Sequence, residues 1–226
     1  MLVPAINPPF PLRWGFTTRD EPGEPGVAAR LNQVHGCRIL EAVLDGTPEA
    51  DGLWTTTPGQ RIGIRVADCV PILLAGRLPD GRPWVAALHA GWRGATGFAL
   101  PPGEGILRQG VGLFRSLGGN PSGLAWALGP AIRFCHFEVG DEVVEAARMD
   151  SAWRDDLLHP GPRGRAHLDL HGFLRAQALD LGLAPGNDGS VPYCTFCRPD
   201  LFWSWRRGDQ AGRQWGLIEI LPEDPS

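Results

Sequence analysis

The chain contains no lysine, so all 21 of its basic residues are arginines. This absence excludes a Schiff base with a carbonyl substrate and the lysine of a P-loop, while guanidinium groups remain for binding anions. The net charge of −4 offers no basic field for nucleic acid. No apolar run approaches the roughly 18 residues of a membrane span. We therefore expect small-molecule partners rather than nucleic acid or a membrane.

Cysteine is also scarce, and its number is odd. Five cysteines spread over 226 residues do not form the framework of a small disulfide-bonded protein. Residues 1–9 lack the basic start and the continuous apolar stretch of a signal peptide, and prolines interrupt them. We therefore expect a cytoplasmic protein with reduced thiols, some of them functional.

No linker or repeat divides the sequence, and a hydrophobic content of 43% is enough for a sizeable core. We expect a single domain over residues 1–226. Helical spacing appears at 106–117, 141–148 and 169–181, and strand-like runs appear at 14–17, 62–66, 72–75, 84–88, 124–128, 191–193, 201–205 and 214–220. Strands and helices do not alternate regularly as in a parallel sheet. The predicted fold class is α+β, with a mixed β-sheet core flanked by helices.

The most informative pattern consists of two histidines and one cysteine. His35 lies in the sequence NQVHG, Cys69 in ADCVP and His89 in HAGWRG, and the last two follow buried strand-like runs. Two imidazoles and a thiolate suit zinc, and three protein ligands leave the fourth position free for water or substrate. Their spacing matches no short zinc signature, so a buried cysteine with two hydrogen-bonded histidines is the alternative. We predict a catalytic zinc site.

Several neighbouring residues are candidates for binding or proton transfer. Asp68 is a candidate general base, although aspartate is also a common turn former. Arg93 lies in the glycine-rich sequence GWRG, which is typical of either a phosphate cradle or a tight turn. Arg206 is a second candidate for binding an anion. Trp203 and Trp205 alternate with Phe202 and Ser204, so in a strand they share one face. That face either stacks on a base or packs in the core.

A rival metal pattern involves His136, Cys194 and Cys197. It imitates the H-x-E and P-C-x-x-C signature of zinc nucleobase deaminases. However, Tyr193 stands where that signature has proline, and the two halves are far apart in the sequence. We therefore disfavour the deaminase pattern, and no role follows for Cys135, Cys194 or Cys197.

His167 and His171 form a second rival pair. If Asp169 caps the following helix, His167 lies outside it and the two rings do not share a helical face. We therefore expect both to be surface histidines.

A set of short motifs extends over nearly the whole chain. In order, they are GFTTR at 15–19, QVHG at 33–36, ADG at 50–52, ADCVP at 67–71, HAGWRG at 89–94, LGPAI at 128–132, FEVG at 137–140, HLDL at 167–170 and CT at 194–195. Together they resemble the YfiH-like, laccase-domain family. The resemblance implies a zinc-dependent purine nucleoside phosphorylase that also deaminates adenosine and cleaves methylthioadenosine. It implies the metal ligands His35, Cys69 and His89.

Two points qualify this resemblance. The family's older name, multicopper polyphenol oxidase, implies many paired histidines, but the chain has six histidines and no His-x-His pair, so zinc is favoured over copper. Family members usually carry a longer segment between the motifs at 15–19 and 33–36. Here only residues 20–32 remain, which implies a different closure over the nucleoside.

The leading hypothesis is phosphorolysis of inosine, adenosine, guanosine or methylthioadenosine. Phosphate attacks the anomeric carbon as the purine leaves, with adenosine deamination as a side activity. Zinc is held by the three predicted ligands, and Asp68 transfers a proton. Arg93 neutralises the phosphate, with Arg19 and Arg206 as further substrate-binding residues.

Two other hypotheses remain open. In one, Cys69 is a nucleophile and His89 its base in an amide hydrolase that acts on a cell-wall peptide precursor. In the other, the chain binds zinc or a nucleoside without turnover. The oligomeric state does not follow from the sequence.

Overall fold

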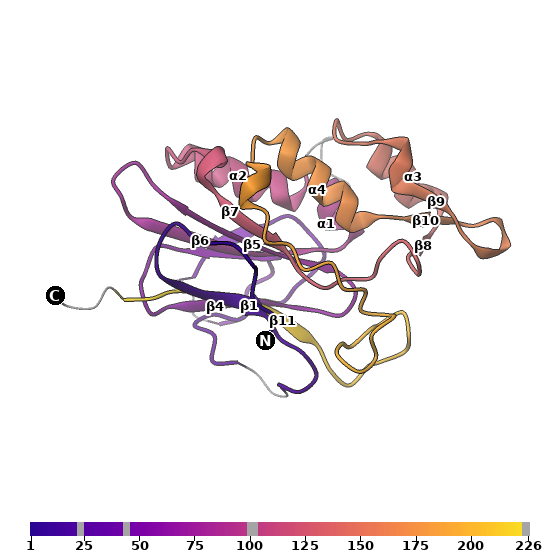
Figure 1. Cartoon of the computed structure of the whole chain (residues 1–226), viewed down its shortest axis with the longest axis horizontal. Helices are drawn as coiled ribbons and strands as arrows, with labels where there is room; N and C mark the ends of the chain where they lie inside the picture. Colours follow the sequence, from indigo (N-terminus) through magenta and orange to yellow (C-terminus); the bar gives the residue numbers. More distant parts are fainter. Residues whose placement is uncertain (22–24, 43–45, 99–103, 223–226) are drawn as a thin grey trace.

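The computed structural model describes residues 1–21, 25–42, 46–98 and 104–222, and its strands form three sheets (Figure 1). The largest sheet has the order β2 (Ile39–Glu41), β3 (Gly52–Thr55), β6 (Pro83–Ala90), β5 (Val70–Arg77) and β7 (Ala125–Leu128). Strands β2 and β3 are parallel, and the other neighbours are antiparallel. The second sheet is antiparallel, with the order β1 (Leu12–Phe16), β11 (Gln214–Ile220) and β4 (Arg61–Val66). The third comprises β8 (Glu138–Val139), β10 (Ala166–Leu168) and β9 (Leu158–Pro160).

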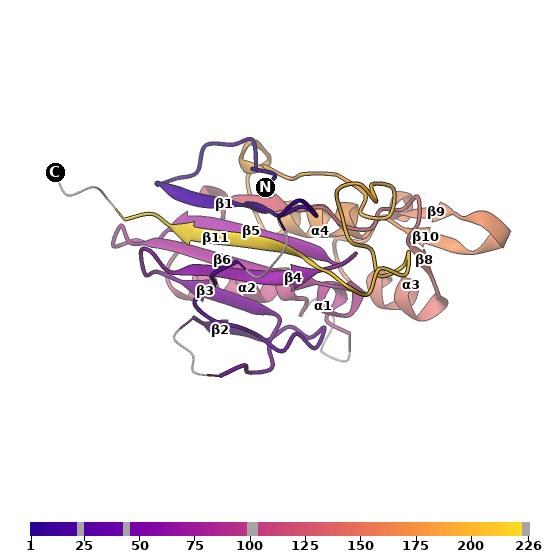
Figure 2. The ribbon, with the colours of Figure 1, turned by 90° about the horizontal axis from the view of Figure 1, so that it is seen from below.

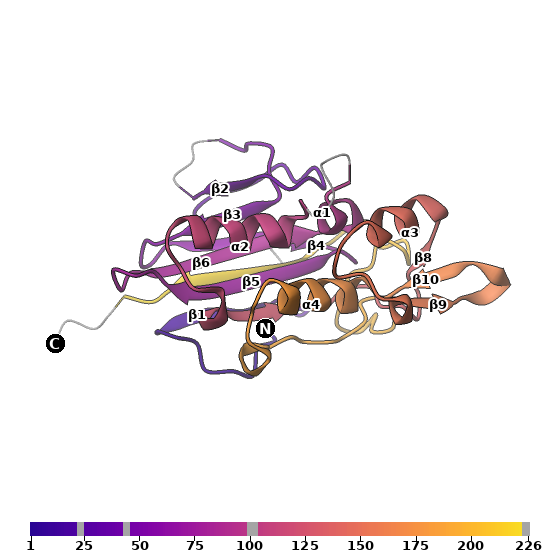
Figure 3. The ribbon, with the colours of Figure 1, turned by 90° about the horizontal axis from the view of Figure 1, so that it is seen from above.

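The sheets and helices are arranged in layers. The helices are α1 (Trp92–Thr96), α2 (Ile106–Ser116), α3 (Asp141–Arg148) and α4 (Leu170–Asp180). Helices α1, α2 and α4 cover one face of the five-stranded sheet (Figure 3), and the β1-β11-β4 sheet covers the other (Figure 2). Helix α3 lies beside the small β8-β10-β9 sheet at one end of the molecule (Figure 1). Within the described ranges, no helix is long and apolar enough to cross a membrane.

The five-stranded sheet is buried on both faces. Along β5, Ile72 and Leu74 pack into the core under the helices, and Leu73 and Ala75 pack into the core against the second sheet. Successive residues of a strand point to opposite faces, so a strand covered on both sides is apolar throughout. Each fully buried leucine or isoleucine stabilises the fold by roughly 1.5–3 kcal/mol. The continuous apolar run at 72–75 therefore specifies the central layer.

The helix predictions are confirmed to within two residues. Helix α2 ends where Gly118 takes a positive φ of 85°, a conformation that glycine adopts without strain. Helix α4 begins after Asp169, whose side chain accepts a hydrogen bond from the Gly172 N–H at 3.0 Å. The mixture of sheets and helices confirms the α+β class.

Two predicted strands are wrong. Residues 201–205 form turns and irregular structure, because side chains satisfy the backbone in place of a neighbouring strand. The Gln214 side chain bonds both backbone groups of Trp203, and Arg19 and Arg207 donate to the Phe202 carbonyl. Residues 191–193 run beside β7 but are joined to it by a single hydrogen bond, from the Val191 N–H to the Leu128 carbonyl.

Candidate active site

The three predicted metal ligands meet at one end of the five-stranded sheet. His89 lies near the end of β6, and Cys69 directly precedes β5, the strand that pairs with β6. His35 comes from the loop before β2. The three donor atoms lie within 4.8 Å of one another, and the His35 and His89 rings are 4.8 Å apart in an edge-on arrangement. We call His35, Cys69 and His89 the three-ligand site.

Unusual backbone conformations accompany this site. His35 (φ 61°) and Asp68 (φ 85°) are the two non-glycine residues with positive φ in the described part of the chain. Such conformations are sparsely populated for residues with a side chain and persist only where the surroundings enforce them. Here the surrounding hydrogen bonds do so, and both residues face the same site.

Asp51 organises two of the three ligands. Its buried carboxylate lies 2.7 Å from His89 Nδ1 and accepts hydrogen bonds from the backbone N–H groups of His35 (2.9 Å) and Gly36 (2.7 Å). Burial acts to raise the pKa of Asp51, but His89 and these N–H donors outweigh it and lower the pKa. A carboxylate on the far nitrogen of a histidine fixes the ring as a metal ligand. The sequence motif ADG contained this residue, but its role was not predicted.

The three-ligand site favours a thiolate. Burial acts to raise the pKa of Cys69, but the neighbouring His89 and His35 rings outweigh it and lower the pKa to about 6. For His89, burial acts to lower the pKa, but Cys69 and Asp51 raise it to about 9. The thiolate is the form of cysteine that binds metals and attacks substrates. Without a metal, protonated His89 is therefore the counter-ion of the Cys69 thiolate, and a bound metal cation would take the place of that proton.

Close packing explains the glycines of the HAGWRG motif. A Cβ on Gly91 would lie 2.9 Å from His35 Cδ2 and 3.1 Å from Cys69 Sγ. A Cβ on Gly94 would lie 2.9 Å from the carbonyl oxygen of Gly36. The segment after Gly91 forms the short helix α1, and its glycines let the His35 loop approach the other two ligands.

The three-ligand site opens into a cavity of about 960 Å³. Flat apolar and cationic side chains line it together with the predicted ligands. The lining residues are Glu21, Gln33, His35, Arg65, Val66, Ala67, Asp68, Cys69, His89, Ile132, Phe137, Trp203, Trp205, Arg206, Gln210, Ala211, Gly212, Arg213 and Trp215. A cavity of this size holds a nucleoside-sized ligand.

Asp68 and Arg206 lie together at the cavity wall. One Asp68 carboxylate oxygen accepts a hydrogen bond from Thr195 Oγ1 at 2.6 Å, and the other accepts one from the Arg206 backbone N–H at 2.7 Å. The Arg206 guanidinium donates to the Glu138 carbonyl at 3.1 Å. These contacts hold Asp68 in its positive-φ conformation and place Arg206 beside the three-ligand site.

The other two predicted arginines do not line the cavity. The Arg93 guanidinium stacks on Trp92, with its carbon 4.5 Å from the ring centre. The Arg19 guanidinium lies 3.8 Å from the centre of the Trp203 ring and pairs with Asp209 at 2.5 Å. Arg19 therefore supports a tryptophan of the cavity wall, and the phosphate role of Arg93 stays a prediction.

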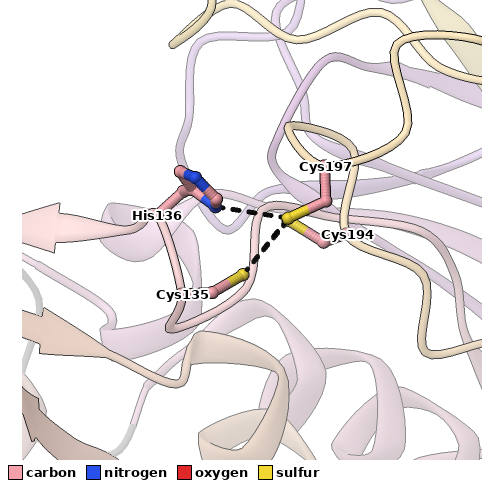
Figure 4. A group of neighbouring side chains, drawn as sticks. All are labelled: Cys135, His136, Cys194 and Cys197. Atoms are coloured by element: carbon pink, nitrogen blue, oxygen red, sulfur yellow. Dashed lines mark hydrogen bonds between the residues drawn. The ribbon is translucent and has the colours of Figure 1, made fainter.

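A second group of potential metal ligands comprises Cys135, His136, Cys194 and Cys197, which we call the four-ligand cluster. Its donor atoms lie within 4.8 Å of one another, and the four side chains point together (Figure 4). The sequence pattern had linked three of these residues only through the disfavoured deaminase signature. The structure brings all four together, although 57 residues separate His136 from Cys194.

The expectation that His167 and His171 are surface residues is wrong. His167 is 7% exposed and lies in β10, where its Nδ1 is 2.6 Å from the Phe134 carbonyl oxygen. His171 is 4% exposed in the first turn of α4, which packs on the core. As predicted, capping by Asp169 leaves His167 outside the helix.

The sheets, the helices and the ligands at the cavity wall define an α+β protein with an open site suited to a metal ion. The sequence family described as "Multi-copper polyphenol oxidoreductase laccase" matches residues 21–221, and the chain belongs to this family. The YfiH resemblance is confirmed by relatives and by a solved structure of that name.

Several relatives carry the names of enzymes. The chain is 37% identical to "Purine nucleoside phosphorylase" of Deinococcus radiodurans, over 85% of this chain and 70% of the relative. It is 35% identical to "Adenosine deaminase RL5" of an unknown prokaryotic organism, over 80% and 70% of the two chains. The crystal structure of YlmD from Geobacillus stearothermophilus superimposes with a TM-score of 0.73 and 29% identity, over 86% of this chain and 73% of that one.

Proposed function

We propose that the chain is a purine nucleoside phosphorylase whose reaction takes place at the three-ligand site. The observation that carries this proposal is the position of that site in the wall of a nucleoside-sized cavity that also presents tryptophans and arginines. The names of the relatives support the same reaction. The substrates would be phosphate and inosine, adenosine, guanosine or methylthioadenosine, with deamination of adenosine as a side activity.

Zinc is the metal that the donor set fits. Two imidazoles and one thiolate are borderline-soft ligands typical of zinc, and three of them leave one position open. The Asp51 carboxylate on His89 and the glycine that admits His35 beside Cys69 are further features of a built metal site. When bound, zinc would polarise a phosphate or ribose oxygen as a Lewis acid.

The cavity side chains have separate tasks in this proposal. Trp203 and Trp205 offer flat apolar surfaces on which a purine base stacks. The guanidinium groups of Arg65, Arg206 and Arg213 neutralise phosphate as it attacks the anomeric carbon. Asp68, which lines the cavity, transfers a proton to or from the reacting groups.

The decisive measurement is hypoxanthine release from inosine by the zinc-loaded protein, with and without phosphate. We expect release that depends on phosphate and disappears in Cys69→Ala. Ribose 1-phosphate should accumulate in equal amount, which distinguishes phosphorolysis from hydrolysis. A zinc-containing protein that releases no base in the presence of phosphate would refute the proposal.

A second candidate function rests on a different feature of the same residues. His89 contacts Cys69 on one side and Asp51 on the other, as a base does between a nucleophile and an orienting carboxylate. The pKa of Cys69 is also lowered to about 6. This arrangement favours a metal-free amide hydrolase, for which the substrate considered from the sequence is a cell-wall peptide precursor. His35 has no task in that mechanism, although the fold strains its backbone to bring it to the site.

Chelation separates the two functions. Metal removal should abolish the phosphorylase and leave the hydrolase active. Alkylation of Cys69 by iodoacetamide should be slow in the zinc-loaded phosphorylase and rapid after chelation. A hydrolase would react rapidly in both states.

A further inference from the structure

The four-ligand cluster has the spacing of a tetrahedral metal site. Cys135 Sγ lies 3.6 Å from both Cys194 Sγ and Cys197 Sγ, and Cys197 Sγ lies 3.3 Å from His136 Nδ1 (Figure 4). With zinc–sulfur bonds of about 2.3 Å and a zinc–nitrogen bond of about 2.0 Å, tetrahedral geometry places two sulfurs about 3.8 Å apart and a sulfur and a nitrogen about 3.5 Å apart. The observed separations lie within a few tenths of an ångström of these values.

Two tight turns present the four donors. In the first, the N–H groups of His136 and Phe137 donate to the Arg133 carbonyl at 2.8 and 2.9 Å, so that Cys135 and His136 lie at the turn. In the second, Cys194 and Cys197 flank a turn in the sequence CTFC. The His136 ring stacks on Phe196 of that second turn, with 4.0 Å between the ring centres. The turns therefore hold the donors without help from a metal.

Contacts beyond the ligands fix the second turn and join it to the segment before the first. Ala131 and Cys194 form an isolated parallel bridge, in which the Thr195 N–H donates to the Ala131 carbonyl at 3.0 Å. The Arg207 guanidinium donates to the carbonyls of Thr195 and Phe196, both at 2.8 Å. The backbone on each side of the cluster is therefore fixed in the register that brings the donors together.

We propose that Cys135, His136, Cys194 and Cys197 form a second zinc site, which is structural rather than catalytic. Three thiolates and one imidazole are a donor set that selects zinc, and four protein ligands leave no open position for substrate. A deaminase role would also require a free glutamate near the metal. Glu138, the glutamate of the HFE sequence, instead pairs with Arg165 at 3.0 Å.

The second site would brace one wall of the cavity. Phe137, which lines the cavity, directly follows the ligand His136. Thr195, which directly follows the ligand Cys194, donates its hydroxyl to Asp68 at 2.6 Å. A metal that ties these two segments together would hold Phe137 and Asp68 in place. We therefore expect its loss to weaken substrate binding through Phe137 and to slow turnover through Asp68, in each case only a few-fold, because the turns are also held by contacts that need no metal.

The test is metal content together with cobalt spectroscopy of the full chain. Protein purified with zinc should contain two zinc ions per chain, and Cys69→Ser and Cys197→Ser should each contain one. Cobalt(II) replaces zinc and gives a sulfur-to-metal charge-transfer band whose intensity grows with the number of bound thiolates. The band should remain strong in Cys69→Ser, which retains three thiolates at the second site. It should be weak in Cys197→Ser with Cys135→Ser, because Cys194 and His136 alone should not hold the second ion, and Cys69 is then the one thiolate bound to a metal.

Cys37→Ser is the matched control, because it removes a thiol that belongs to neither group and whose Sγ donates to the Gly94 carbonyl at 3.3 Å. It should keep two metals and the full band. One zinc per chain that is lost in Cys69→Ser, with Cys135 and Cys197 alkylated as freely as in denatured protein, would overturn the second site. A disulfide among Cys135, Cys194 and Cys197 that persists in protein purified under reducing conditions would also overturn it. These readouts do not depend on nucleoside phosphorolysis.

Discussion

The three-ligand site and the four-ligand cluster are made of the same kinds of side chains in different settings. The first is embedded at the end of the five-stranded sheet, with strained backbone at His35 and a buried carboxylate, Asp51, behind His89. The second is carried by two turns, and Cys135 and Cys197 in it are exposed. The first opens into the cavity, and the second has four potential donors, one more than the first. The number of ligands and their support are therefore what distinguish the proposed catalytic site from the proposed structural one.

The proposed division between a catalytic and a structural site is tested most directly by removing one thiolate from each group. We expect Cys69→Ser to lower the rate of phosphorolysis more than about 100-fold, because a zinc ligand and its charge are lost. We expect Cys197→Ser to lower the turnover rate and to raise KM by only a few-fold each, and to melt at a lower temperature. Steady-state kinetics and thermal unfolding, measured on both variants and on the unmodified protein, check these expectations. Equal loss of activity in both variants would contradict the division of roles.

Asp51→Asn tests the carboxylate that only the three-ligand site possesses. The variant keeps the size of the side chain but offers an amide to backbone N–H groups that need an acceptor. We expect zinc to bind about 10–100-fold more weakly at this site, since a supporting carboxylate contributes about that much. Competition with a coloured chelator measures the affinity.

Asp150→Asn is the control for Asp51→Asn, because Asp150 is also buried but pairs with Arg108 at 2.7 Å, away from both groups of ligands. It should lower stability and leave zinc affinity unchanged. An unchanged affinity in Asp51→Asn as well would show that the carboxylate serves only the fold.

The cavity arginines test whether the open site handles phosphate. Arg206→Gln should raise the KM for phosphate by about tenfold, as expected for losing a hydrogen bond to a charged group. Arg93→Gln should change it little, because the Arg93 side chain stacks on Trp92 and does not line the cavity. The two variants remove the same charge at different places. A larger effect at Arg93 would support the prediction made from the sequence and would require the α1 segment to move.

Sequence patterns predicted the layers of the fold because apolar periodicity reports burial directly. Helices at 106–117, 141–148 and 169–181 and the strands around Cys69 and His89 agree closely with the structure. The strand expected at 201–205 shows the limit of this reasoning. Alternating aromatic residues there place Phe202 and Ser204 in the interior, while Trp203 and Trp205 line the cavity. Hydrogen bonds from Arg19, Arg207 and Gln214 replace the neighbouring strand, and such distant side-chain contacts leave no periodic signal.

The two groups of ligands also differ in how far the sequence alone could predict them. The three-ligand residues stood in distinctive motifs, two of them after strand-like runs, and the sequence therefore predicted their meeting. In the four-ligand cluster, only the C-x-x-C half has a familiar spacing, since Cys135 and His136 are adjacent and lie far away in the sequence. Asp51 was missed because an aspartate in ADG is also a common turn former. Burial and its four hydrogen-bonded neighbours, Val34, His35, Gly36 and His89, reveal its role only in three dimensions.

The smallest predicted effect is a loss of folding stability in acid. A variant of His171 distinguishes this loss from the one that metal release would cause. Burial in α4 lowers the pKa of His171 from its usual 6.5 to about 4, with a further contribution from Arg133. Between pH 6.5 and pH 4, His171 is protonated in the unfolded chain and neutral in the folded chain. The free energy of unfolding therefore keeps its full value above pH 6.5 and falls as the pH drops toward 4. At pH 5.5 the loss amounts to about 1 kcal/mol. His171→Asn does not titrate there and should flatten this part of the unfolding curve measured in chelator. An unchanged slope in the variant would assign the acid sensitivity to other groups.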